Sequence, residues 1–239
     1  MKLALISDIH GNSVALEAVL ADIETRNVDQ IIVLGDLCYR GPEPKQALDL
    51  IRALNAKVIK GNADEWVIRG VNQGEVPDKA LELMKMEQAW IRQKLSDADV
   101  QYLEQLPSEL SLTYGNMSIH AFHATPHSLF DIVLPEQTNE ELLMKLTANR
   151  DADLYIYGHI HRAYMRVVNG KTIINSGSVG LPFDGLNQAS YAIVEINDQS
   201  FITSHIRVPY DIEQVCKQYE ANNYPNKEMM QQIIRTGSN

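Results

Sequence analysis

The sequence predicts an α/β protein with two β-rich halves and helices outside them, and two observations carry this prediction. Residues 2–62 alternate short apolar runs with amphipathic segments in the order strand, helix, strand, helix, strand. This order favours parallel strands with right-handed crossovers, and such sheets bind ligands beyond the carboxyl ends of their strands. After residue 107, apolar runs are paired across Gly-Asn or Asn-Gly dipeptides, which are typical of hairpin turns.

The N-terminal strands and helices follow from short patterns. Buried strands are predicted at KLALIS (2–7), DQIIVLGD (29–36) and AKVIKGN (56–62). The helix after the first strand has apolar residues at helical spacing, and Asn12 or Ser13 can cap it. Pro42 and Pro44 mark the start of the second helix, which extends through Leu54.

A change of composition from Glu65 to about Leu106, toward Glu, Lys, Gln, Met and Leu, predicts a helical insertion. We expect breaks in this insertion, about 65–106, near Gly74–Pro77 and Ser96–Asp97. It could act as a lid over a site, or it could form a dimer surface. The expected organisation is therefore one domain over residues 1–239 that carries this insertion.

The C-terminal half is predicted to be rich in hairpins. They are expected at 109–124, at 163–178 and at 190–206, the last with the turn NDQ. A helix near Asn139 to Thr147 is expected to precede the strand DLYIYGH (153–159). The tail from Asp211 to Tyr219 is predicted to form a closing helix, and the last residues are expected to be frayed.

Composition limits the classes of partner. The net charge of −10 argues against a broad nucleic-acid or membrane surface, although it allows a local cationic pocket. The apolar run Leu3 to Ile6 is too short for a signal peptide, and no later stretch could span a bilayer. Cys38 and Cys216 are too few for a disulfide framework and predict buried free thiols in a reducing compartment. We expect a cytoplasmic protein, and its oligomeric state is left open.

Polar side chains gather where the predicted strands end. They are Asp8, His10, Asp36, Asn62, His123, His159 and His161. In extended chain, residues two apart point the same way, so Asp8 can converge with His10, and His159 with His161. This nitrogen and oxygen set without sulfur suits manganese, iron, zinc or nickel. Seven candidates are too many for one tetrahedral ion and fit two ions that share a carboxylate.

Acidic residues, histidines and short motifs of this kind also have simpler interpretations when each is taken alone. Asp8 and Asp36 could be loop or capping residues, and His120 and His205 are better explained as structural histidines. A single His-x-His or GNAD segment could equally arise by chance or form a turn. The joint pattern, with every candidate at a predicted strand end, favours the metal site.

Five short motifs together resemble the calcineurin-like metallophosphoesterase superfamily. They are DIH (8–10), GDLCYRG (35–41), GNAD (61–64), the His of FHATP (122–126) and GHIH (158–161). The likeness is greatest to small bacterial and archaeal members of the phosphodiesterase-like branch, with similarity also to the phosphoprotein phosphatase branch. It implies a four-layer α/β/β/α sandwich with the metals at the sheet edges.

The resemblance also implies a ligand set and a reaction. The first metal would be held by Asp8, His10 and His161, the second by Asn62, His123 and His159, with Asp36 bridging them. The cofactors would be two divalent transition-metal ions, with manganese favoured and iron, zinc or nickel as alternatives. Ions about 3.5–4 Å apart depress the pKa of a shared water, and the resulting hydroxide attacks phosphorus in line. We expect the substrate to be a small phosphodiester or nucleotide phosphoanhydride, on the grounds given next for Ala63, and the acidic net charge argues against an extended nucleic acid.

One position departs from the family pattern. Ala63 stands where many members have a histidine that protonates the leaving oxygen, and Asp64 could instead cap a helix that begins near Glu65. General acid catalysis contributes about 10²–10⁴-fold, so its loss would favour good leaving groups rather than abolish the chemistry. His127 could supply the proton from its loop, although a solvated loop histidine is the simpler interpretation.

Arg40 of GDLCYRG is the candidate phosphate contact, because a guanidinium offers a fork that matches two phosphoryl oxygens. Tyr39 replaces the aspartate that commonly steadies this arginine, so a free surface arginine is an alternative. Asn175 and the following SGSVG could present backbone N–H groups near the site, or simply form a tight turn.

Two other functions compete with a phosphodiesterase or anhydride hydrolase. Arg40 suggests a protein phosphatase of the same fold. A non-enzymatic scaffold of the same fold is the alternative from another class, and the complete set of seven ligand candidates argues against it.

Overall fold

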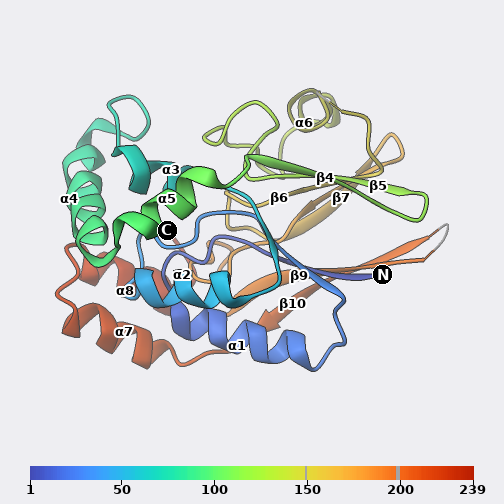
Figure 1. Ribbon diagram of the computed structural model, residues 1–239. Helices are drawn as coiled ribbons and strands as arrows, with labels where there is room; N and C mark the ends of the chain where they lie inside the picture. The colour runs from blue at the N-terminus through green and yellow to red at the C-terminus, as the bar shows by residue number, and fades with distance from the viewer. Residues whose placement is uncertain (149, 198–199) are drawn as a thin grey trace.

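The computed structural model describes residues 1–148, 150–197 and 200–239, which form two five-stranded mixed sheets flanked by helices (Figure 1). The first sheet has the order β10-β9-β1-β2-β3. Its strands are β1 (Lys2–Ile6), β2 (Gln30–Val33), β3 (Lys57–Val58), β9 (Ala189–Ile196) and β10 (Phe201–Val208). The strands β1, β2 and β3 are parallel, as predicted, while β9 runs antiparallel to β1.

The second sheet has the order β4-β5-β6-β8-β7. Its strands are β4 (Glu109–Tyr114), β5 (Met117–Phe122), β6 (Leu154–Tyr157), β7 (Tyr164–Val168) and β8 (Lys171–Asn175). The three central strands are parallel, and the pairs β4–β5 and β7–β8 are the hairpins predicted from Gly115-Asn116 and Asn169-Gly170. The hairpin β9–β10 is also confirmed, although residues 198 and 199 of its turn lie outside the described residues.

Side-chain alternation along the strands builds four layers. Leu3 and Leu5 of β1 pack with Leu154 and Ile156 of β6 in an apolar cluster between the sheets. The alternate residues of β1 belong instead to a cluster with α1 (Ser13–Glu24) and α2 (Pro44–Ala53). Those of β6 pack against α6 (Asn139–Leu146). Successive strand residues face opposite sides, so the expected α/β/β/α sandwich is confirmed, with α6 above and α1 and α2 below the sheets in Figure 1.

The helical segment between β3 and β4 contains α3 (Asn62–Arg69), α4 (Asp78–Lys94) and α5 (Asp97–Gln105). The breaks near residues 74–77 and at Ser96 are as predicted, and the Ser96 side chain caps α5 by accepting from Asp99 N. The first helix begins at Asn62 rather than near Glu65, so Asn62 sits in its first turn. This segment lies at one end of the two sheets (Figure 1).

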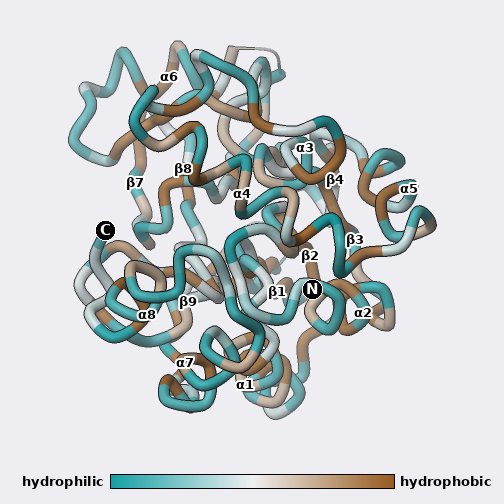
Figure 2. Tube along the Cα trace, turned by 90° about the vertical axis from the view of Figure 1, so that its left-hand side faces the viewer, coloured by the Kyte–Doolittle hydropathy of each residue, from teal (hydrophilic) through white to brown (hydrophobic). Residues whose placement is uncertain are grey.

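Two expectations about individual elements are wrong. The strand AKVIKGN is reduced to the two residues of β3, because the chain turns directly into α3. The residues after α7 (Ile212–Ala221) are not frayed but form α8 (Lys227–Thr236), which buries Met230, Ile233 and Ile234. In Figure 2 these helices alternate brown and teal along the chain, as expected for helices with one buried face.

Both cysteines are free and buried, as predicted. Within the described ranges, no helix is long and apolar enough to cross a membrane.

Candidate metal centre

Most of the candidate ligands lie on loops that follow the carboxyl ends of the strands, and most of these loop residues have an unusual backbone conformation. Among the described residues other than glycine, nine have a positive φ, and three of these are asparagines, which tolerate it. The other six are candidate site residues: Asp8, His10, Asp36, Arg40, His159 and His161. A left-handed conformation costs about 1–3 kcal/mol for such a residue, and this kind of strain concentrates at functional sites.

The convergence of Asp8 with His10 therefore has a different cause from the one expected. Strand alternation was the predicted reason, but φ is 54° at Asp8 and 50° at His10, so the chain is not extended there. The backbone of the loop is held instead by the loop after β2, where His10 N donates to Asp36 O at 2.9 Å. The two left-handed residues turn their side chains to the same side.

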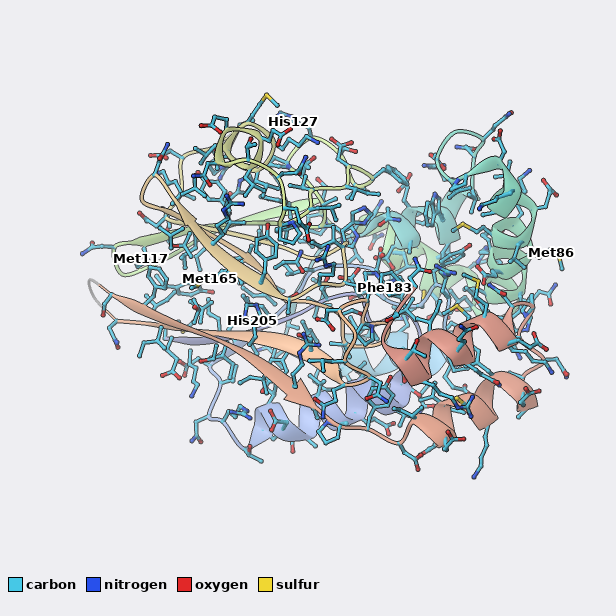
Figure 3. All side chains as sticks on the ribbon, turned by 180° about the vertical axis from the view of Figure 1, so that it is seen from behind. Met86, Met117, His127, Met165, Phe183 and His205 are labelled. Atoms are coloured by element: carbon cyan, nitrogen blue, oxygen red, sulfur yellow. The ribbon has the colours of Figure 1, made fainter. Side chains whose placement is uncertain are left out.

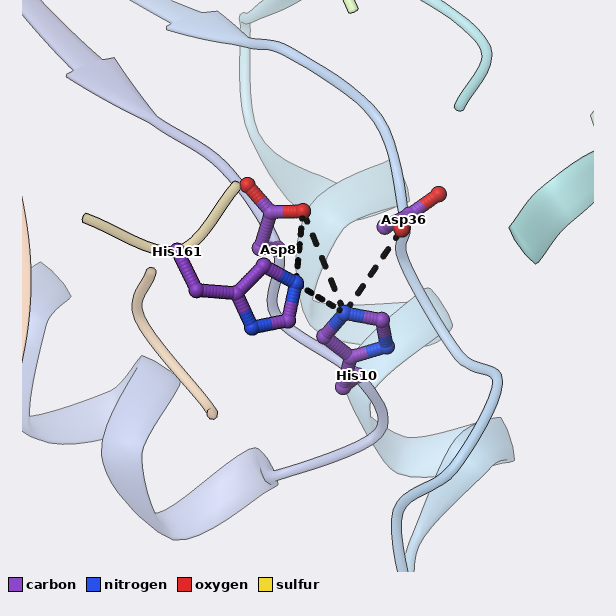
Figure 4. A group of neighbouring side chains, drawn as sticks. All are labelled: Asp8, His10, Asp36 and His161. Atoms are coloured by element: carbon purple, nitrogen blue, oxygen red, sulfur yellow. Dashed lines mark hydrogen bonds and ion pairs between the residues drawn. The ribbon is translucent and has the colours of Figure 1, made fainter. Parts of the chain in front are cut away.

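The first group of candidate ligands contains Asp8, His10, Asp36 and His161, whose ligand atoms all lie within 4.8 Å of one another (Figure 4). His161 Nε2 is 3.2 Å from Asp8 Oδ1 and 3.0 Å from His10 Nε2. His10 Nε2 is in turn 3.6 Å from Asp36 Oδ2. All four side chains are buried.

A second group of candidate ligands lies beside Oδ1, the other carboxylate oxygen of Asp36. His123 Nε2 is 3.4 Å from Asp36 Oδ1, and with His159 these residues could hold a second ion. Oδ1 of Asn62 lies 2.9 Å from His123 Nε2 and 2.9 Å from His159 Nδ1. The structure thus brings all seven predicted side chains together, and Asp36 lies between the two groups.

The ring nitrogens in the first group fit a cation. His10 Nδ1 is 2.8 Å from the carbonyl oxygen of Tyr39, and His161 Nδ1 is hydrogen-bonded to the carbonyl oxygen of Leu181. A carbonyl only accepts, so each Nδ1 donates, and Nε2 is the atom through which each ring can bind a metal. The two Nε2 atoms face each other 3.0 Å apart beside Asp8 Oδ1, which is buried and lies 3.2 Å from His161 Nε2. A bound cation would satisfy all three atoms.

The pKa values of most of these groups favour the forms that bind metal. Burial, with nearby His161, lowers the pKa of His10 to about 4, and burial with His123 lowers that of His159 to about 4. Both rings are therefore neutral at pH 7. Burial opposes ionisation of Asp36, but the neighbouring histidines outweigh it and lower its pKa, so it is a carboxylate.

His123 differs from His10 and His159 in the direction of its pKa shift. Burial would lower its pKa, but Asp36 outweighs burial and raises it to about 9. Its Nδ1 donates to the carbonyl oxygen of Leu34 at 2.7 Å, so the proton that would have to leave for ligation is the one on Nε2, facing Asp36.

The arrangement of strands and ligand candidates agrees with the comparison to known families. The family model described as the calcineurin-like phosphoesterase superfamily domain matches residues 1–199. The chain belongs to this superfamily. The prediction of a hydrolase that acts on phosphate esters is thereby confirmed at the level of the family.

This phosphoesterase is similar to individual proteins over most of its length. An uncharacterised protein of Methanocaldococcus jannaschii is 30% identical over 93% of this chain and 93% of its own length. Phosphodiesterase YfcE of Escherichia coli is 27% identical over 84% of this chain and 96% of its own. The crystal structure of a metallophosphoesterase from Sphaerobacter thermophilus has a TM-score of 0.78 at 29% identity, with 99% of each chain covered.

Asp64 of this phosphoesterase does more than cap a helix. Its carboxylate is fully buried and accepts hydrogen bonds from three backbone N–H groups, those of Asp36 (2.8 Å), Leu37 (2.9 Å) and Gly61 (2.9 Å). It therefore ties the loop that carries Asp36 to the first turn of α3. Gly61 is required between them, because a Cβ there would fall on the Asp36 carboxylate.

The segment after β8 supports the loop of Asp8. Ser178 Oγ and Gly180 N both donate to the Asp8 carbonyl oxygen, at 2.7 and 3.0 Å. Asn175 Nδ2 donates to the carbonyl oxygen of Gly158, the first residue of the GHIH segment, at 2.6 Å. Here the backbone and hydroxyl groups contact the ligand loops, so the segment has a supporting role as well as forming a turn.

A cavity of about 210 Å³ lies beside the two groups of ligand candidates. One part of its lining is polar and includes His10, Asp36 and Arg40. The other part is apolar and comes largely from the helical segment, with Tyr39, Trp66, Val76, Met84 and Phe183. Phe183 is not among the predicted site residues, and its ring stacks on His161 with centroids 4.3 Å apart.

The two predicted catalytic residues differ in their placement. Arg40 lines the cavity beside the candidate ligands, and its side chain is only 19% exposed, so it is not a free surface arginine. His127 is exposed and is not among the described residues that line the cavity. In Figure 3 it lies at the upper edge of the molecule, well apart from Phe183.

Proposed function

We propose that this protein is a dinuclear metal-dependent phosphoesterase that hydrolyses a small phosphodiester or a nucleotide phosphoanhydride. The observation that carries the proposal is the position of Asp36, whose Oδ2 faces His10 at 3.6 Å and whose Oδ1 faces His123 at 3.4 Å. One carboxylate thus presents one oxygen to each group of ligand candidates. This geometry supports a carboxylate that is shared between two ions.

The proposed ligands are assigned by these groups. Asp8, His10 and His161 would hold one ion and Asn62, His123 and His159 the other, with Asp36 shared. The nitrogen and oxygen donors suit a borderline divalent ion, and we propose manganese in a cytoplasmic enzyme. When bound, two such ions acidify a shared water and neutralise charge on the phosphoryl oxygens.

The residues of this chain then bind and orient the substrate. Arg40 lines the same cavity as His10 and Asp36, where its guanidinium can donate to phosphoryl oxygens. The apolar wall of Trp66 and Phe183 would receive the group attached to phosphorus. A volume of about 210 Å³ is below the usual range for drug-sized ligands, which supports a small substrate or one that inserts only one end.

The residue at position 63 decides which kind of leaving group we expect the enzyme to favour. The Ala63 side chain has no proton to give to a leaving group. The backbone N–H of Ala63 donates a hydrogen bond to Asp36 Oδ1 at 2.8 Å. An enzyme without an acid at this position favours esters or anhydrides whose leaving oxygen is stable without protonation. We propose such substrates in preference to alkyl phosphomonoesters.

The test is a panel of substrates and ions. Protein reconstituted with Mn²⁺, Fe²⁺, Zn²⁺ or Ni²⁺ is assayed with bis(4-nitrophenyl) phosphate, 4-nitrophenyl phosphate, cyclic nucleotides, dinucleoside polyphosphates and a phosphopeptide. We expect two ions per chain by elemental analysis, and kcat/KM values for diesters or anhydrides above those for the monoester. Preference for the phosphopeptide would instead indicate a protein phosphatase, and no turnover with any ion would indicate a scaffold.

The positions of the ions provide an independent check. In crystals soaked with Mn²⁺, anomalous density is expected on both sides of Asp36. Density elsewhere in the molecule, or a single peak that does not contact Asp36, would contradict the proposed ligand set.

A further inference from the structure

Glu87 of α4 is a buried carboxylate to which the proposed function gives no part. Its side chain is 0% exposed, and its Oε2 lies 3.6 Å from Nε of Arg40. Its Oε1 accepts from Asn226 Nδ2 at 3.2 Å. Burial raises the pKa of Glu87, while Arg40 acts in the opposite direction.

Among the described residues, the only ion pair that Arg40 or Glu87 makes is the one between them. Arg40 Nε and Glu87 Oε2 are both buried, and neither has a hydrogen-bond partner among the described residues. A buried charge is costly unless it is paired, so each of these groups is the main compensation for the other. The pairing is therefore a constraint on where the guanidinium can lie.

The backbone of Arg40 is fixed as well. Its φ of 70° is left-handed, and its carbonyl oxygen accepts from the Tyr219 hydroxyl of α7 at 2.8 Å. With the backbone fixed, the direction of the side chain depends on Glu87. A guanidinium has five N–H donors in a planar fork, so contact through Nε leaves both terminal nitrogens for the cavity that Arg40 lines.

We infer that Glu87 is a positioning residue that directs the Arg40 guanidinium toward the phosphoryl group of the substrate. This inference rests on the proposed function. It also gives the helical segment and the C-terminal helices a part in binding, because Glu87 lies on α4, Tyr219 on α7, and Asn226 immediately before α8. Glu87 takes the place of the aspartate that Tyr39 replaces in the GDLCYRG motif.

The test is a double-mutant cycle on the binding of inorganic phosphate. The dissociation constant of phosphate is measured by calorimetry on manganese-loaded wild type, Glu87→Gln, Arg40→Ala and the double variant. The assays are made above neutral pH, because the raised pKa of Glu87 shifts its ionisation upward. Loss of a charge-assisted contact should weaken phosphate binding about tenfold in Arg40→Ala and by a similar factor in Glu87→Gln.

Coupling is the deciding result. If Glu87 acts through Arg40, then Glu87→Gln should have no further effect on phosphate affinity in the Arg40→Ala background. Wild-type affinity in Glu87→Gln, or independent additive losses in the double variant, would overturn the inference. The matched control is Glu82→Gln on the same helix, where the side chain is 82% exposed, and it should bind phosphate as wild type does.

Two further measurements separate positioning from folding and from the proposed function. Glu87→Asp keeps the charge and shortens the reach, so it should fold and show weaker phosphate binding with a raised KM for the diester and a smaller change in kcat. Unchanged phosphate affinity in a folded Glu87→Asp protein would overturn the inference. If the wild-type protein binds phosphate but hydrolyses no substrate, the proposed function is refuted while the inference about Glu87 is not. The double-mutant cycle on phosphate affinity would still measure the coupling between Glu87 and Arg40.

Discussion

Replacing Asp64 by alanine should destabilise the loop that carries Asp36 and with it the whole fold. The Asp64 carboxylate is fully buried and accepts from the backbone N–H groups of Asp36, Leu37 and Gly61 at 2.8–2.9 Å. Alanine provides no acceptor, so the substitution leaves three buried donors without a partner. Each unsatisfied buried donor costs about 1–3 kcal/mol.

The expected loss follows from these three contacts. Taking the lower figure for each, because water can enter the space left by the side chain, gives about 3 kcal/mol. For a chain of this size, 1 kcal/mol corresponds to about 2–4 °C in Tm, so a decrease of about 6–12 °C is expected. Affinity for Mn²⁺ should fall as well, because Asp36 and Asn62 lie on the two segments that Asp64 joins.

The pH dependence of this loss has a defined sign. Burial and then Asp36 raise the pKa of Asp64 to about 7. A carboxyl group whose pKa is raised by folding contributes stability below its ordinary pKa, and that contribution disappears as the pH rises through about 7. The destabilisation caused by Asp64→Ala should therefore be larger at about pH 5 than at about pH 8.

Thermal denaturation of the metal-free protein at both pH values measures these quantities. Asp131→Ala, which alters an exposed loop aspartate, is the matched control. A decrease in Tm no larger than that of the control would show that the three hydrogen bonds do not hold the loop, and a larger loss at the higher pH would refute the assigned sign.

Four other predictions concern the site and the C-terminal helix. Asp36→Ala should abolish turnover in reconstituted protein, and unchanged turnover would refute a shared carboxylate. Ala63→His should raise kcat/KM for phosphomonoesters with poor leaving groups by up to about 10²-fold, measured on phenyl phosphate, with 4-nitrophenyl phosphate little affected. The pKa of His123 is raised to about 9, so Mn²⁺ binding at pH 7 should release a proton, and the affinity for Mn²⁺ should increase as the pH rises toward 9. Calorimetry that gives the same binding heat in buffers of different ionisation enthalpy would contradict this proton release. Ile234→Ala should cost about 2–5 kcal/mol in denaturant unfolding if α8 is packed as described, whereas a loss below 1 kcal/mol would indicate a frayed end.

The strands and the ligand candidates could be predicted from the sequence because both are encoded locally. An apolar run followed by Asp8, Asp36 or His159 identifies a strand end and a polar loop in the same few residues. The family resemblance supplied the pairing of loops that are distant in the chain. Helix α8 was also encoded locally, since Met230, Ile233 and Ile234 have helical spacing, but three residues at a chain end are a short pattern to weigh against fraying.

The conformations inside the loops could not be predicted in the same way. Nothing in the segment DIH shows that Asp8 and His10 are left-handed, because that conformation is imposed by backbone hydrogen bonds from the loop after β2 and from Gly180. The functions of Asp64 and Glu87 have the same origin. Each accepts or pairs with groups from another part of the fold, and propensity at the residue itself carries no information about them.

The strain and the electrostatics of the site point to one physical cause. Six non-glycine site residues hold a left-handed backbone, and the Nε2 atoms of His10 and His161 lie 3.0 Å apart beside the buried Oδ1 of Asp8. None of these features stabilises the polypeptide by itself, and a four-layer sandwich with cores on both faces of each sheet is what holds them in place. Divalent cations would turn the same features into favourable contacts. The rigid strands therefore provide the stability that holds the strained loops at their ends in place, and these loops keep the candidate ligands arranged for metal binding.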